Sequence, residues 1–242
     1  MQIYSRTDVG LVREINQDAC RYGMLSDTCA WAVVCDGMGG ENGGNVASKI
    51  AVETISDIIQ SEYLDELSDE ALSDLIIKAV QTANNNIYQT AINDISLSGM
   101  GTTAELAFLR NNLLYIAHVG DSRAYIMRGN KIKQITKDHS LVQEMIESGE
   151  LTEEEAKVHP NKNLITRALG ISEDIKLDFI EAPAQSGDIL ILTTDGLTNY
   201  VSENEMISVI GNGDIENACE HLVDMAKSAG GSDNITVTLI IV

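Results

Sequence analysis

The sequence lacks any long apolar run. None of its segments approaches the roughly 20 consecutive apolar residues that a membrane-spanning helix needs. The N-terminal residues MQIYSRTDVG also lack the apolar core of a signal peptide. These absences predict a cytoplasmic protein that does not associate with a membrane. At 242 residues the chain can bury a full core, and neither Pro160 nor Pro183 marks a domain boundary, so we expect one domain over 1–242.

Basic residues are scarce. The chain has 16 Lys and Arg against 37 Asp and Glu, a formal net charge of −21. Such a field repels nucleic acid and attracts cations, which argues against a nucleic-acid-binding protein. Acidic runs such as DELSDEALSD are typical of solvated faces, so the net charge alone does not identify a function.

The four cysteines contain no C-x-x-C pair, which argues against a zinc knuckle or a redox motif. Cys35 lies next to Asp36 and is a conceivable nucleophile. However, no neighbouring histidine or basic residue would lower the pKa of its thiol. We therefore expect buried, reduced thiols.

Periodicity predicts both strands and helices. Short β-branched and apolar runs predict strands at 31–35, 102–109, 113–119, 124–128, 189–194 and 235–242, with the consecutive central strands antiparallel. Apolar residues at helical spacing predict helices over about 47–58, 72–87 and 214–229, and Ser202 with Glu205 resembles a capping box before another helix. Segment 139–170 mixes short helical and loop-like sequence and is expected to form a mobile subdomain. The order of elements predicts sheets between helical layers.

Five aspartates stand at predicted strand ends: Asp18, Asp36, Asp121, Asp195 and Asp233. Each alone is explained as a turn or capping residue. All five together are harder to explain as turn or capping residues, because turns also accept Asn, Ser or Gly and would not require Asp at every position. If the carboxylates converge, two unit charges about 4 Å apart repel by about 4 kcal/mol at an effective dielectric of 20. Hard cations such as Mg²⁺ or Mn²⁺ would relieve that repulsion.

The glycines of DGMGGENGG follow Asp36 and would let backbone carbonyls approach such a cation closely. Two divalent ions bridged by a carboxylate generate a hydroxide nucleophile and stabilise an in-line phosphoryl displacement. A substrate phosphate also needs a fixed cation. Arg13, on the loop before Asp18, is the candidate because a guanidinium can grip two phosphate oxygens, although alone it is better explained by a surface salt bridge.

Eight motifs resemble, in order and over essentially the whole chain, one enzyme family: TDVGLVREINQD, VVCDGMGG, GMGTTAELA, AHVGDSRAY, ITKDHS, LITRALG, ILTTDGLTNYVS and SDNITVTLI. The family is the metal-dependent serine/threonine protein phosphatases, or protein phosphatase type 2C, in their short bacterial form. The resemblance implies an α+β, four-layer α-β-β-α sandwich with two central antiparallel sheets flanked by helices. It also implies a dinuclear Mn²⁺ or Mg²⁺ centre, where a metal-bridging hydroxide attacks phosphoserine or phosphothreonine monoesters directly.

The resemblance further implies residue roles. Asp36 would bridge both ions, Gly37 would offer its carbonyl, and Asp195 and Asp233 would bind the first ion. Asp18 would act through bound water and Arg13 would hold the substrate phosphate. Asp121 would contribute to a third, weaker metal site. The segment before LITRALG would be the flap that touches substrate, within 139–170.

The chain departs from the family at two positions. Animal members carry a histidine, proposed as the general acid, where this chain has Met38, and methionine cannot donate a proton. Glu41 stands where bacterial relatives often have histidine. His139, in the KDHS motif, is expected to be structural rather than catalytic.

The substrates expected from the family are phosphorylated proteins, including a cognate membrane-bound Ser/Thr protein kinase and its targets, with the phosphatase acting as a monomer. A narrower alternative is a phosphorylated regulator such as an anti-sigma-factor antagonist. Another is a catalytically dead module that shields phosphoproteins, which the complete set of acids disfavours. The acidic ELTEEE run predicts discrimination against acidic peptides and a preference for basic ones. The choice between Mn²⁺ and Mg²⁺ stays open.

Overall fold

Two antiparallel sheets form the centre of the molecule. The computed structural model describes the backbone of residues 1–242 and every side chain except those of residues 41 and 42, so Glu41 lies outside the described side chains. One sheet runs in the order β1 (Gln2–Asp8), β11 (Ile235–Ile241), β10 (Ile189–Thr193), β7 (Arg123–Arg128) and β8 (Lys131–Gln134). The other runs β2 (Asp18–Ser26), β3 (Cys29–Met38), β5 (Ala104–Arg110), β6 (Leu113–Val119) and β9 (Asp178–Pro183), with short β4 (Gly101–Thr102) paired to β3.

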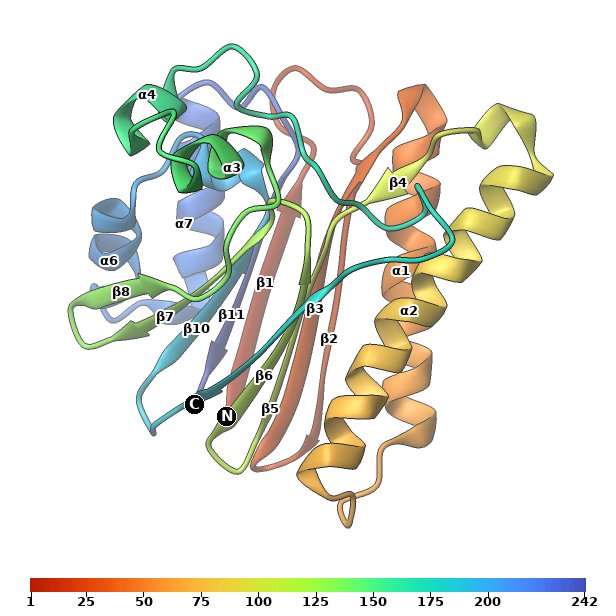
Figure 1. The fold of residues 1–242 in the computed structure, drawn as a ribbon. Helices are drawn as coiled ribbons and strands as arrows, with labels where there is room; N and C mark the ends of the chain where they lie inside the picture. The colour runs from red at the N-terminus through yellow and green to blue at the C-terminus, as the bar shows by residue number, and fades with distance from the viewer.

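Helices cover the outer face of each sheet (Figure 1). The long helices α1 (Gly40–Glu62) and α2 (Asp69–Asn93) lie on the six-stranded sheet and are followed by the short η1 (Ile95–Leu97). The other sheet is covered by α5 (Asp195–Thr198), α6 (Glu203–Gly211) and α7 (Ile215–Ser228). The predicted four-layer α-β-β-α sandwich is confirmed. No helix among the described residues is long and apolar enough to cross a membrane.

Three clusters of buried apolar side chains lie between the two sheets and the two layers of helices and hold them together. Alternate residues of β3 explain how, because successive side chains in a strand point to opposite faces. Ala30 and Ala32 pack between the sheets, while Trp31 and Val33 pack toward α1 and α2. A third layer, which includes Leu239, lies under α7. Burial on both faces is the reason that the central strands are near-continuous apolar runs in the sequence.

The strands that sequence periodicity missed lie at or next to sheet edges: β1, β2, β8 and β9. Their partly exposed residues dilute the apolar signal. The predicted block of consecutive strands is also divided. β5 and β6 pair in one sheet, whereas β7 and β8 pair in the other, so the chain crosses between sheets after Val119. Loop 9–17 makes the same kind of crossing from β1 to β2.

Both crossings lie at one end of the sandwich, and the two termini lie at the opposite end (Figure 1). Segment 139–170 covers part of the crossing end with two short helices, α3 (Leu141–Glu147) and α4 (Glu153–Lys157). Isolated bridges from Ser140 to Ile165 and from Thr102 to Leu169 join this segment to itself and to β4. Its role as a flap stays a prediction.

Candidate metal centre

The register of the strands brings the predicted aspartates to the crossing end. Asp18 pairs directly with Asp36 across β2 and β3, and Asp8 of β1 pairs with Ile235, two residues after Asp233. A pocket of about 840 Å³ opens there. Its lining includes six of the seven residues that sequence analysis selected: Arg13, Asp36, Gly37, Asp121, Asp195 and Asp233. Asp18, the seventh, does not line the pocket and is almost fully buried.

The positions of two aspartates differ in detail from the sequence-based expectation. Asp18 begins β2 rather than closing a strand, and Asp36 lies inside β3 rather than after it. The two therefore face one another as a cross-strand pair of like charges, an arrangement that destabilises a sheet by itself. A pairing that opposes folding at the bottom of a pocket indicates a functional site.

The pKa values of this pair show the electrostatic cost. Burial raises the pKa of Asp18 to about 7, although hydroxyl hydrogen bonds from Thr236 and Thr194, 2.7 and 2.9 Å from Oδ2, act against it. Burial also raises the pKa of Asp36 well above its usual range, and repulsion from Asp18 and Asp195 adds to the effect. The uncompensated site therefore favours protonated carboxyl groups.

The pKa values of Asp195, which follows β10, and Asp121, which follows β6, are also raised. Burial and repulsion from Asp233 raise the pKa of Asp195, while hydrogen bonds with Asp36 and Asn199 offset part of the shift. Burial and repulsion from Asp195 raise the pKa of Asp121 to about 8. A bound cation would reverse all of these shifts, because an adjacent positive charge favours the ionised carboxylate.

The donor set fits hard divalent cations. Oδ1 of Asp18 and Oδ1 of Asp195 are both buried without a hydrogen-bond partner among the described residues. An unsatisfied buried carboxylate oxygen is costly, and a cation or a water held by one would satisfy it. No group of three or more Asp, Glu, His or Cys side chains among the described residues is arranged to hold a metal ion by itself. A divalent ion held here would therefore need backbone oxygens or waters among its ligands, which Mg²⁺ accepts.

Gly37 is required for packing as well as for the expected metal contact. A Cβ at this position would collide with the carbonyl oxygen of Gly44 in α1 and lie 2.6 Å from the carbonyl oxygen of Gln17. The Gly37 amide donates to that same Gln17 carbonyl over 3.1 Å. The glycine-rich start of α1 thus lets three backbone segments meet beside the bottom of the pocket.

Arg13 is half exposed and hydrogen bonded to Asp233, with Nη2 3.0 Å from Oδ2. Asn234, which sequence analysis did not single out, holds the Arg13 loop in place. Its buried amide accepts from the Gln17 N–H over 2.7 Å and donates to the carbonyls of Val9 and Ile15, each over 3.0 Å. Only its place in the SDNITV motif beside Asp233 could have drawn attention to it.

Thr103 was also missed. Its Oγ1 accepts from the Asp36 amide over 2.8 Å and is 2.7 Å from the hydroxyl of Ser122, the residue after Asp121. It therefore links the backbone of one pocket aspartate to the neighbour of another. The threonine pair in GMGTT was the available signal, but threonine is so common in strands that it indicates little alone.

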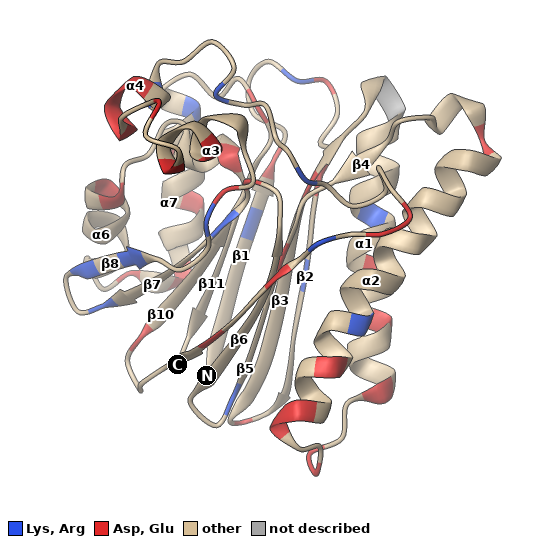
Figure 2. Ribbon diagram, in the orientation of Figure 1, with Lys and Arg blue, Asp and Glu red and all other residues tan. Residues whose placement is uncertain are grey.

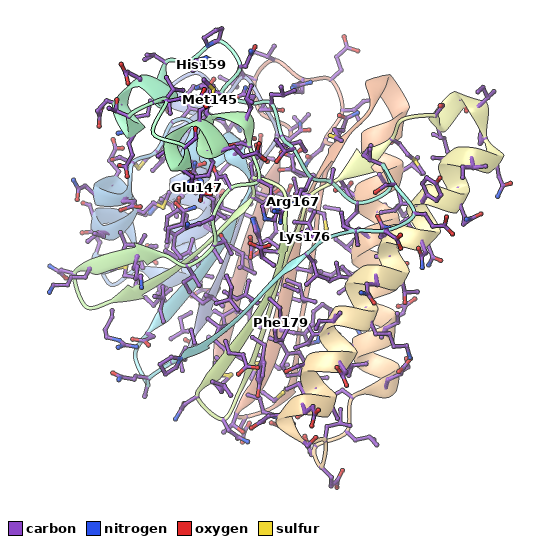
Figure 3. All side chains as sticks on the ribbon, in the orientation of Figure 1. Met145, Glu147, His159, Arg167, Lys176 and Phe179 are labelled. Atoms are coloured by element: carbon purple, nitrogen blue, oxygen red, sulfur yellow. The ribbon has the colours of Figure 1, made fainter. Side chains whose placement is uncertain are left out.

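His139 is buried and does not line the pocket. Its Nδ1 accepts from the Gly120 amide over 3.1 Å, and Arg167 contacts both its Nε2 and Asp178 at 2.9 Å. Figure 3 shows Arg167 below α3, where the segment returns toward the sheets. Burial lowers the pKa of His139 to about 4, with repulsion from His118 and Arg167. A neutral ring in this position connects the segment to the loop before Asp121.

Comparisons with known proteins agree with this geometry. Residues 12–234 match the family model described as protein phosphatase 2C. The chain belongs to the protein phosphatase 2C family. Enzymes of this family are metal-dependent hydrolases that remove phosphate from serine and threonine side chains of proteins, and this protein is such a phosphatase.

Individual phosphatases of the family are similar over nearly their full length. The serine/threonine phosphatase stp of Listeria welshimeri is 39% identical over 236 residues, which cover 97% of this chain and 93% of that protein. The structure of the Streptococcus agalactiae serine/threonine phosphatase superposes with a TM-score of 0.92 at 34% identity, covering 100% of this chain and 99% of the other. The PstP catalytic domain in complex with two manganese ions has a TM-score of 0.86 at 31% identity, covering 98% and 96%.

The acidic run of segment 139–170 lies away from this phosphatase's pocket. Figure 2 shows acidic residues, coloured red on the ribbon, gathered on α4, where Glu153, Glu154 and Glu155 form the first turn. None of them lines the pocket, whereas Asn163 and Ile165 of the same segment do. A preference for basic over acidic peptides, expected from this run, would therefore have to act from outside the pocket lining, and it stays a prediction.

Proposed function

We propose that this phosphatase holds two divalent ions in the pocket at the crossing end, with Asp36 between them. Asp195, Asp233 and the carbonyl of Gly37 would be further ligands, Asp18 would act through water, and Asp121 would hold a third, weaker ion. The observation that carries this assignment is the pair of buried carboxylate oxygens, on Asp18 and Asp195, that lack a partner among the described residues. Their all-oxygen surroundings suit manganese or magnesium.

When bound, such ions would supply a water of lowered pKa as the nucleophile near neutral pH, and positive charge to neutralise the phosphate. The chain itself would bind and orient the substrate. Arg13 lines the pocket, is half exposed, and uses one of its five N–H groups on Asp233. Its other donors would grip two phosphate oxygens and turn phosphorus toward the acidic bottom of the pocket.

The proton for the leaving serine or threonine oxygen would come from solvent. Met38 lines the pocket at the position of the animal family's proposed acid and has no proton to give. Of the histidines, none lines the pocket, and His139 is held between Gly120 and Arg167. The pocket is open to water on the substrate side, where Arg13 and Glu14 are exposed.

We further propose that the substrates include a cognate Ser/Thr protein kinase and its targets, and that the enzyme works as a monomer in the cytoplasm. The four free cysteines suit a reducing compartment. All of the proposed ligands come from one chain, so the site needs no partner subunit. Segment 139–170 is proposed as a flap because it contributes Asn163 and Ile165 to the pocket wall.

The test is phosphatase activity with and without metal. Wild-type protein with Mn²⁺ should hydrolyse p-nitrophenyl phosphate and a phosphothreonine peptide, and EDTA should abolish both activities. Asp36→Asn and Asp195→Asn should each lower kcat by at least about 100-fold, while the exposed Asp74→Asn on α2 keeps wild-type activity. Full activity of Asp36→Asn, with manganese binding unchanged in calorimetry, would remove the assignment.

A further inference from the structure

The rim of the pocket carries exposed aliphatic side chains next to the proposed phosphate-binding arginine. Leu11, Val12 and Ile15 are 62%, 67% and 40% exposed, and they lie within two residues of Arg13. Val12 and Ile15 line the pocket itself. Three exposed positions of loop 9–17 are therefore occupied by aliphatic side chains, which form no hydrogen bonds with water.

Segment 139–170 brings apolar side chains to the same pocket. Ile165 lines it, and the preceding Leu164 is 54% exposed. Met38, near the end of β3, also lines the pocket. Apolar residues from three separate parts of the chain therefore surround an acidic bottom, and exposed apolar surface rimming a polar site is typical of a place where a ligand binds.

The charges of the rim limit which peptides can use it. Arg13 is the one cationic side chain among the described residues that line the pocket, and the substrate phosphate would bind to it. Glu14 beside it is exposed and acidic, and Lys162 donates to Asn199 rather than lining the pocket. An acidic residue next to the phosphorylated one would find no cation in the lining and would meet the field of a chain with net charge −21.

We propose that the substrates of this site are phosphopeptide segments with aliphatic or aromatic residues directly flanking the phosphorylated one, and without acidic neighbours. Val12 and Ile15 would contact the residues on one side of the phosphorylated residue. Ile165 and Leu164 would contact another part of the phosphopeptide. Apolar residues beside the phosphorylated residue would cover the exposed aliphatic side chains of the rim. An acidic residue there would find no cationic side chain among the described residues of the lining. This substrate class rests on the proposed phosphatase function of the same pocket.

The test compares four phosphothreonine peptides that differ only in the flanking residues: leucine, serine, lysine or aspartate. Wild-type enzyme with Mn²⁺ should prefer the leucine-flanked peptide over the serine-flanked one by about tenfold in kcat/KM, the size expected for covering one or two methylene groups per contact. The aspartate-flanked peptide should be the poorest of the four.

The double variant Val12→Ser, Ile15→Ser should reduce the leucine-to-serine ratio to about threefold, because Ile165 and Leu164 keep their share of the apolar contact. Leu64→Ser, which removes a 62% exposed leucine between α1 and α2, is the matched control and should keep the full ratio. Because each ratio is taken within one variant, a general change in activity cancels. Equal rates on all four peptides, a lysine-flanked peptide that exceeds the leucine-flanked one, or a full ratio in the double variant would overturn the proposal. Failure of the phosphatase function would look different, because p-nitrophenyl phosphate, which has no flanks, would then also go unhydrolysed.

Discussion

Replacing Asp18 by asparagine should make the metal-free protein more stable at neutral pH, although it removes a residue of the proposed metal centre. The Asp18 carboxyl has a pKa of about 7 in the folded protein against an ordinary value of 3.8. The folded state therefore keeps a proton that the unfolded state has already lost. Such a group contributes stability below the unfolded pKa, and this contribution disappears as the pH rises through the folded pKa.

The magnitude follows from the interval between the two pKa values. Each pH unit between them costs about 1.36 kcal/mol. From about pH 5 to about pH 8, Asp18 should therefore lower the free energy of unfolding by about 2.5 kcal/mol, or roughly 5 to 10 °C in Tm for a chain of this size. Asparagine has no proton to lose, and its Oδ1 can still accept from the hydroxyls of Thr194 and Thr236.

The assay is urea unfolding of wild type and Asp18→Asn in EDTA over this pH range. Their difference reports Asp18 together with its repulsion of Asp36, since the general repulsion of a highly acidic chain is nearly the same in both. Saturating Mn²⁺ should reverse the order, because a cation stabilises the ionised carboxylate that only the wild type can supply. Parallel pH profiles of the two metal-free proteins would refute the reasoning.

The remaining predictions concern backbone packing, phosphate recognition and the support of Asp36. Gly37→Ala should lower the free energy of unfolding by about 2 to 4 kcal/mol in urea because its methyl group meets backbone oxygens, whereas Gly211→Ala at the end of α6 should stay within about 1 kcal/mol of wild type, because its methyl group would only make an ordinary contact with the Met127 side chain, 3.9 Å away. Arg13→Lys should lower kcat/KM on a phosphopeptide by about 10- to 100-fold, since lysine keeps the charge but not the two-pronged grip; wild-type kinetics would contradict this. Thr103→Val should weaken manganese binding in calorimetry by about 5-fold or more, because the Asp36 amide loses its acceptor, and Thr103→Ser should restore it.

The sequence was most informative where burial is continuous. The central strands are buried on both faces, so their apolar runs stand out without any knowledge of partners. The edge strands could not be found in this way, because β1, β8 and β9 expose part of each strand to water. Pairing, rather than local composition, makes them strands.

The division of the central hairpins between two sheets shows a second limit. The segments 113–119 and 124–128 are neighbours in sequence, and sequence analysis predicted only that the consecutive central strands are antiparallel. Their actual partners are β5 and β10, which are set by how the two sheets stack. Because the chain leaves one sheet at Val119 and enters the other at Arg123, Asp121 lies at the crossing.

The sequence by itself determined which chemistry is available: five aspartates at ordered motifs, one arginine beside them, and glycines where a side chain cannot fit. Only the tertiary structure decided that these groups meet. Asp18 and Asp233 are far apart in the chain, and the antiparallel registers of β2 with β3 and of β1 with β11 carry them to the same end of the sandwich. The contacts that hold the site, such as those of Asn234 with Val9 and Ile15, join residues more than 200 positions apart. Local pattern cannot encode such contacts, because their geometry is fixed by the packing of two whole sheets.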